Sequence, residues 1–189
     1  MRKRTRVSIS LGVAVLFIFF LVGGKRYIDA EILLPWALAA IVHELGHIAA
    51  AKAAGIRIEG MHLGLLGARL SLSDGVISYG KEAAVALAGP GINIFCAMLF
   101  RMSFPAFCEF SLLLGVLNLL PIVSFDGYRI LYCIISKLSN SLAAERVLKV
   151  VSLGFIFMLW LISVYFLIRY KANVSLFVFA CALFIKAAM

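Results

Sequence analysis

The residues best suited to chemistry lie in one short segment, His43-Glu44-Leu45-Gly46-His47. On a helix, positions four residues apart share a face, so both imidazoles are predicted to bind one Zn²⁺ ion. The carboxylate of Glu44 lies between them and is placed to take a proton from water beside the metal. The alternative is a pair of hydrogen-bonded core histidines. That alternative is weak here, because ionisable groups inside an apolar segment are costly and usually functional.

A catalytic zinc ion usually has three protein ligands, so a third ligand must come from elsewhere in the chain. His62 is the only other histidine, and it lies in a segment where an interfacial role is expected. A cytoplasmic N-terminus would place the ends of two apolar runs on the cytoplasmic side: the run before Asp126 and the run that contains His43 and His47. Glu109 lies near the outer end of its run. Since three ligands of one ion must lie at the same depth in the membrane, Asp126 is favoured over Glu109 as the third ligand. The alternative role of Asp126 is a helix cap.

The composition indicates that membrane-spanning helices must position these residues. Of 189 residues, 64% are hydrophobic and 14% are charged, and the mean hydropathy is +1.08. A soluble core of this length cannot bury that much apolar surface, which excludes a soluble globular enzyme and a disordered chain. The net charge of +9 comes mostly from the ends of apolar runs. Such charges are typical of membrane flanks that touch lipid and do not favour a nucleic-acid partner.

Hydropathy predicts an all-α polytopic membrane fold with about six transmembrane helices in a single domain, residues 1–189. Residues 56–80 are broken by charges, and Ala68 to Ser73 alternate before an Asp74-Gly75 turn signal. This pattern favours a small β-hairpin between the second and third spans over a polar loop. The expected spans are 7–24, 32–54, 83–100, 104–121, 150–168 and 173–187.

Basic residues predict the orientation of these spans. The apolar run 7–24 follows four basic residues and has no A-x-A cleavage site, which favours an uncleaved first span over a secretory signal peptide. With the N-terminus inside, 13 of the 18 Lys and Arg residues fall in cytoplasmic segments. We therefore expect a multi-pass protein of a bacterial-type cytoplasmic membrane, with both termini and the active site towards the cytoplasm.

Two segments with proline and glycine are predicted to break spans near the site. Pro121 lacks an N–H and ends a helix, Gly127 permits an open turn, and Asn118 can hydrogen-bond the freed backbone. Gly89-Pro90-Gly91 predicts a second break, in the third span. Asn93 follows it and can hydrogen-bond substrate backbone or an oxyanion, or alternatively a neighbouring helix. Broken backbone at membrane depth is tolerated where it lines a wet cavity.

Three motifs together resemble the site-2 proteases, the intramembrane zinc metalloproteases of peptidase family M50. They are H-E-x-x-H at 43–47, G-P-x-x-N at 89–93 and N-x-x-P-x-x-x-x-D-G at 118–127. The resemblance implies one Zn²⁺ per chain on His43, His47 and Asp126, with Glu44 as catalytic base. It also implies cleavage of a peptide bond in or near a transmembrane or membrane-tethered segment of a protein. A strand near residues 56–80 would then present the substrate in extended form.

The layout most resembles the bacterial sporulation proteases, which process a membrane-tethered sigma-factor precursor. That resemblance leaves room for a regulatory membrane partner besides the substrate and the lipid bilayer. Only 78 residues separate His47 from Asp126, so no PDZ domain is expected between them. The chain reaches Met189 just after the last expected span, so no CBS domain is expected either, and the sequence looks like the membrane core alone.

Two other functions compete with proteolysis. One is a non-catalytic, metal-binding membrane scaffold, and the other is a small ion transporter that uses the same ionisable residues. Transporters often show paired internal repeats, and none is visible in this sequence. Bound zinc that a chelator removes would favour the protease over the transporter, and cleavage of a tethered substrate would separate the protease from the scaffold.

Overall fold

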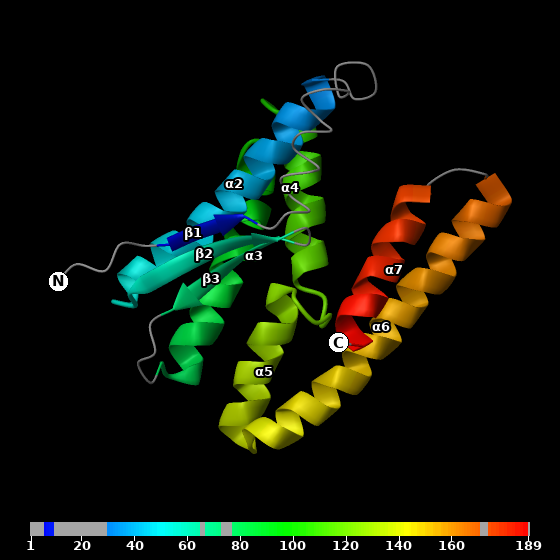
Figure 1. Ribbon diagram of the computed structural model, residues 1–189. Helices are drawn as coiled ribbons and strands as arrows, with labels where there is room; N and C mark the ends of the chain where they lie inside the picture. The colour runs from blue at the N-terminus through cyan, green and yellow to red at the C-terminus, as the bar shows by residue number, and fades with distance from the viewer. Residues whose placement is uncertain (1–5, 10–29, 65–66, 73–76, 171–173, 189) are drawn as a thin grey trace. The chain divides into compact units, whose positions relative to one another are not determined.

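The computed structural model describes residues 6–9, 30–64, 67–72, 77–170 and 174–188 (Figure 1). By internal contacts the chain divides into two compact units, Met1–Leu117 and Asn118–Met189. The first unit holds β1 (Arg6–Ile9), α2 (Ala30–Ala53), β2 (Ile58–Gly64), β3 (Gly67–Leu72), α3 (Tyr79–Leu99) and all of α4 (Pro105–Asn118) except its last residue. The second holds α5 (Asp126–Leu138), α6 (Ser141–Tyr170) and α7 (Val174–Ala188).

Three described helices are long and apolar enough to cross a membrane, at Glu31–Ala53, Tyr79–Leu99 and Ser141–Arg169. They overlap the predicted spans 32–54, 83–100 and 150–168. The predicted spans 104–121 and 173–187 correspond to shorter apolar helices, Pro105–Asn118 and Leu176–Ala187. Long apolar helices of this kind identify a multi-pass membrane protein.

The predicted first span, 7–24, is wrong at its start. Residues 6–9 form strand β1 instead of a helix, and residues 10–29 lie outside the described residues. The segment reads Arg-Val-Ser-Ile, so polar and apolar residues alternate with the period of a strand. Mean hydropathy does not register this alternation, so a short strand at the start of a long apolar run was predicted as part of a span.

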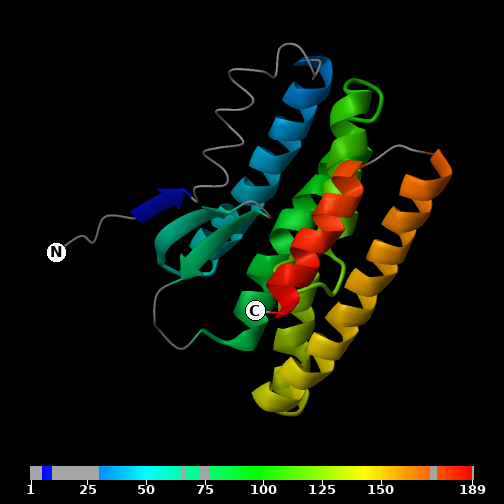
Figure 2. The ribbon, with the colours of Figure 1, turned by 45° about the vertical axis from the view of Figure 1, so that its right-hand side comes forward.

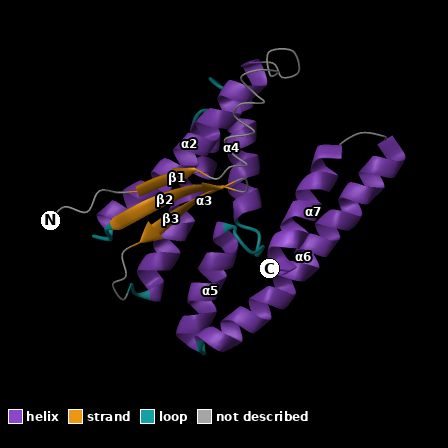
Figure 3. Cartoon of the chain, in the orientation of Figure 1, coloured by secondary structure: helices purple, strands orange, loops and turns teal. Residues whose placement is uncertain are grey.

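The predicted hairpin lies in residues 58–72, as part of a sheet with the order β1-β2-β3 (Figure 3). β2 and β3 pair antiparallel, with Met61 opposite Leu70, and β1 pairs parallel with β2. β2 ends at Gly64 and β3 begins at Gly67, so the strands connect there and not at Asp74-Gly75. The end of the predicted hairpin segment, 56–80, is helical instead, because Tyr79 begins α3, with Ser78 Oγ accepting a bond from the N–H of Lys81.

α3 is continuous, so the predicted break at Gly89-Pro90-Gly91 is wrong. Pro90 removes only one backbone N–H from the helix, and packing against neighbours can compensate for that loss. α2 and α3 lie side by side in Figures 1 and 2. A Cβ atom on Gly46 of α2 would lie 2.7 Å from the carbonyl oxygen of Ala88 in α3. The glycines in these helices therefore permit close contact between them.

Replacing Gly46 with alanine is expected to separate α2 from α3. The new methyl group would meet backbone, which cannot move aside, so we expect a loss of about 1–3 kcal/mol in the free energy of unfolding. Thermal or denaturant unfolding in detergent measures the change. Gly154→Ala is the matched control, because a Cβ at this exposed position of α6 meets nothing within 4 Å. Equal stability of the two variants would contradict this account of the helix contact.

Hydropathy alone did not predict helix α5 or the first turns of α6 in the second unit. α5 has strongly segregated polar and apolar faces, so its mean hydropathy is too low to predict a span. α6 begins nine residues before the predicted span, at Ser141. The side chain of Asn140 accepts a hydrogen bond of 2.7 Å from the N–H of Ala143 and so caps its first turn. α6 packs against both α5 and α7 (Figure 2).

Candidate metal centre

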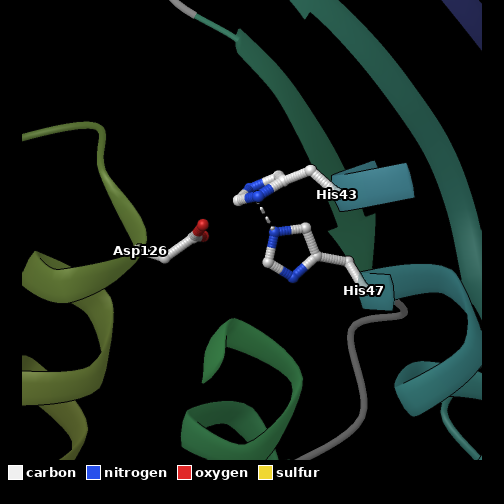
Figure 4. A group of neighbouring side chains, drawn as sticks. All are labelled: His43, His47 and Asp126. Atoms are coloured by element: carbon white, nitrogen blue, oxygen red, sulfur yellow. Dashed lines mark hydrogen bonds between the residues drawn. The ribbon is translucent and has the colours of Figure 1, made fainter. Parts of the chain in front are cut away.

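His43 and His47 lie one turn apart on α2, and their imidazole rings point towards one another (Figure 4). Both side chains are buried, with 5% and 7% of their surface exposed. Their Nε2 atoms are 3.2 Å apart. Two nitrogen ligands of one tetrahedral zinc ion, each about 2.0–2.1 Å from the metal, would be separated by about 3.3 Å. The histidine pair therefore already has the spacing of two ligands of one ion.

A backbone contact fixes the orientation of His47. Its Nδ1 lies 2.7 Å from the carbonyl oxygen of Val85 in α3. A carbonyl can only accept, so Nδ1 carries the proton and Nε2 keeps its lone pair for a metal. Such outer contacts of histidine ligands commonly set the tautomer and the ring orientation.

Gly89, which was predicted to break the helix, instead lies within α3 against the ring of His47. A Cβ atom at this position would collide with Nε2 and the neighbouring carbon atoms of the His47 ring. α3 can therefore approach the ring of His47 only because residue 89 has no side chain. The signal that could have found it is the presence of glycines in both apolar runs, Gly46 in one and Gly89 in the other.

Asp126 is the first residue of α5, and only 9% of its surface is exposed. A carboxylate in the first turn of a helix is favoured by the helix dipole. The next residue, Gly127, is pressed against the carbonyl groups of Leu119 and Leu120, where a Cβ would collide with backbone. The predicted open turn at Gly127 is therefore wrong: Gly127 is the second residue of α5, and it is tightly packed against these carbonyl groups.

One nitrogen from each histidine and one carboxylate oxygen of Asp126 all lie within 4.8 Å of one another (Figure 4). All three residues are buried. Two imidazoles and one carboxylate form a donor set that suits catalytic zinc, with a coordination position left for a small molecule. The donor set and its spacing fit one Zn²⁺ ion. The competing carboxylate, Glu109, is exposed and outside this group, and His62 lies on β2.

The other predicted site residues are located as follows. Glu44 lies between the two histidines on α2 and is partly buried. Asn93 of α3 is fully buried, and its amide has no hydrogen-bond partner among the described residues. Asn118 is the last residue of α4, and Pro121 lies in the connection that follows. A buried amide without a partner is unusual and marks Asn93 for a functional explanation.

α5 and α6 also form an open pocket of about 300 Å³, lined by Tyr128, Arg129, Tyr132 and Glu145. Burial raises the pKa of Tyr128, and the charges of Glu145 and Tyr132 raise it further. The Tyr128 hydroxyl therefore stays protonated at neutral pH and can donate a hydrogen bond there.

Apolar helices long enough to span a membrane, with a buried two-histidine, one-carboxylate group, identify a membrane protein with a candidate zinc site. The sequence profile of peptidase family M50 matches residues 100–162, which include Asp126. A curated relative, a zinc metalloprotease of Methanocaldococcus jannaschii, is 29% identical over 163 residues, covering 75% of this chain and 47% of the relative. The chain thus spans about half the length of that relative. The chain is thus similar to peptidase family M50 over residues 100–162 and to a zinc metalloprotease over a longer part of its length.

A solved structure gives the same fold. The site-2 protease from Methanocaldococcus jannaschii matches with a TM-score of 0.68 and 21% identity, over 100% of this chain and 92% of that one. Both relatives are archaeal, and neither name refers to sporulation. Neither comparison selects the sporulation subgroup.

Proposed function

We propose that this chain is an intramembrane zinc metalloendopeptidase of the site-2 type. Its substrate would be a membrane protein, cut in or near a transmembrane or membrane-tethered segment. The observation that carries the proposal is the buried group of His43, His47 and Asp126 on a membrane protein. The matches to peptidase family M50 and to a zinc metalloprotease support the same reaction.

In the proposed mechanism, His43, His47 and Asp126 hold the zinc ion. When bound, Zn²⁺ supplies a Lewis acid that polarises the scissile carbonyl and acidifies water. Glu44 acts as general base: its carboxylate accepts a proton from the attacking water. It then donates that proton to the nitrogen of the leaving amide, which completes hydrolysis of the peptide bond.

Four further residues complete the proposed site. The amide of Asn93 is buried and would donate a hydrogen bond to the substrate backbone or to the developing oxyanion. Asn118, Pro121 and Gly127 would shape the connection that carries Asp126. Support for Gly127 comes from its tight contact with the carbonyl groups of Leu119 and Leu120.

The proposal includes a location and a substrate class. Both termini and the site would lie towards the cytoplasmic side, since basic residues are concentrated in the segments assigned there. The substrate would be a regulatory precursor of the sigma-factor type, and a second membrane protein would control the reaction. The described residues would act as one protease domain. Membrane proteomics would test the substrate class, because uncut precursors should accumulate in cells with an inactive variant.

Metal removal tests the proposed function directly. A chelator such as 1,10-phenanthroline is expected to abolish cleavage of a membrane-tethered substrate by the purified protein. Zn²⁺ should restore cleavage, whereas Mg²⁺ should not, because imidazole ligands favour zinc over magnesium. Elemental analysis should find one zinc per chain before treatment. Cleavage that persists in metal-free protein would refute the proposal, and stoichiometric zinc without cleavage would favour the scaffold.

A further inference from the structure

The connection between α4 and α5 carries Asp126, and a tight turn forms its last part. The N–H of Phe125 donates a hydrogen bond of 2.9 Å to the carbonyl of Ile122. Between them, Ser124 has a φ of 89°, in the left-handed region that favours glycine. A non-glycine residue keeps such a conformation only where the surrounding structure enforces it. The turn therefore requires a stabilising contact from another part of the structure.

A side chain of α6 supplies this stabilising contact. The backbone N–H of Val123, at the corner of this turn, donates a hydrogen bond of 2.8 Å to Oγ of Ser152. The neighbouring Ile122 is fully buried, and Phe125 has only 7% of its surface exposed. These buried neighbours limit the access of water to the partly buried N–H of Val123, and Ser152 supplies its hydrogen-bond partner.

Ser152 occupies a position where the helix otherwise buries apolar side chains. It belongs to a buried stripe along α6, spaced four residues apart: Ala144, Leu148, Ser152 and Ile156. Its own surface is 0% exposed. A buried hydroxyl is unfavourable unless it makes a hydrogen bond, so a serine in this stripe indicates a specific role. The bond to Val123 supplies that role.

We infer that Ser152 is a positioning residue for the metal centre: its hydroxyl fixes the turn that sets the direction of Asp126. Val123 is three residues before Asp126, and the turn ends at Phe125, next to the first turn of α5. A displacement of Val123 therefore shifts the carboxylate. The inference rests on the proposed function, since it takes Asp126 as a zinc ligand.

Ser152→Ala tests the inference through zinc affinity, which needs no substrate. Titration against a chelator of known affinity should give a zinc Kd raised by up to about 10-fold, the lower end of the effect of groups that contact ligands directly, because Ser152 acts through the backbone of Val123. Cleavage should be restored as free zinc is raised, because the ligands themselves remain. The matched control is Ser163→Ala. Ser163 is also fully buried on α6, but its hydroxyl bonds within the helix, to the carbonyl of Trp160 at 2.7 Å. This control should keep the wild-type zinc Kd.

Ser152→Thr separates positioning from packing. It keeps the hydroxyl and adds a methyl group, so its melting temperature should fall while its zinc Kd stays within about twofold of wild type. If Ser152→Ala cannot be purified folded, Ser152→Cys replaces it, with a similar volume, a weaker acceptor and a raised Kd. Equal zinc Kd values for the alanine variants at 152 and 163 would overturn the inference, as would a zinc loss in Ser152→Thr equal to that in Ser152→Ala.

Asp126→Ala, measured in the same titration, distinguishes the two possible failures. A raised zinc Kd in Asp126→Ala beside an unchanged Kd in Ser152→Ala would reject the role of Ser152 alone. An unchanged zinc Kd in Asp126→Ala would reject Asp126 as a ligand, and with it the metal site of the proposed function.

Discussion

Replacing Glu44 with glutamine is expected to abolish cleavage while zinc stays bound. Glutamine has nearly the same shape but cannot accept the proton of the attacking water, and general acid–base catalysis contributes about 10²- to 10⁴-fold to such reactions. Zinc should remain, because its donor set consists of His43, His47 and Asp126. Elemental analysis measures the metal, and the conversion of a membrane-tethered substrate measures activity.

Glu109→Gln is the matched control for this experiment. It makes the same change at an exposed carboxylate of α4 that lies outside the donor set. This variant should keep both zinc and activity. Wild-type cleavage by Glu44→Gln would remove Glu44 from the mechanism, and loss of zinc from Glu44→Gln would assign it a ligand role instead.

The second large effect is expected from Gly89→Ala, in which one added methyl group should disable the metal centre. The methyl would collide with Nε2 of His47, the atom that faces the other histidine. The ring and α3 cannot both keep their positions. We expect the zinc Kd to rise at least about 10-fold, by analogy with other changes next to metal ligands. Overpacking should also lower the free energy of unfolding by about 1–3 kcal/mol.

Gly91→Ala is the control for that result. Gly91 lies two residues further along α3 and is exposed, and a Cβ there meets nothing within 4 Å. Alanine favours the helix, so stability should be unchanged or raised by up to about 1 kcal/mol, with wild-type zinc affinity. Normal zinc binding by Gly89→Ala would show that α3 can move away from His47.

The candidate metal group of His43, His47 and Asp126 was predictable because its signals are local or topological. The spacing of His43 and His47 depends only on the period of a helix. Asp126 was found from its depth along a span, although the helix that carries it, α5, was not predicted. The depth of a residue in the membrane follows from its position along a predicted span, and this requires no knowledge of which helix faces pack together. A ligand set can therefore be read from sequence before its surroundings are known.

The supporting contacts were not predictable, because each joins residues that are distant in sequence. The contact of Val85 with His47 spans 38 residues, and the contact of Val123 with Ser152 spans 29. Such contacts depend on the relative rotation and register of packed helices, which hydropathy does not contain. The same limit explains the error at Gly89-Pro90-Gly91: locally the segment favours a break, yet packing of α3 keeps the helix continuous.

The bond between His47 and Val85 bears on how the protein matures. Only α2 and α3 make this bond, so the ring takes its orientation as soon as the two helices pair. In zinc fingers, by contrast, the metal itself drives folding. This bond needs no metal, so we expect helix assembly to come before metal loading and the metal-free chain to be folded.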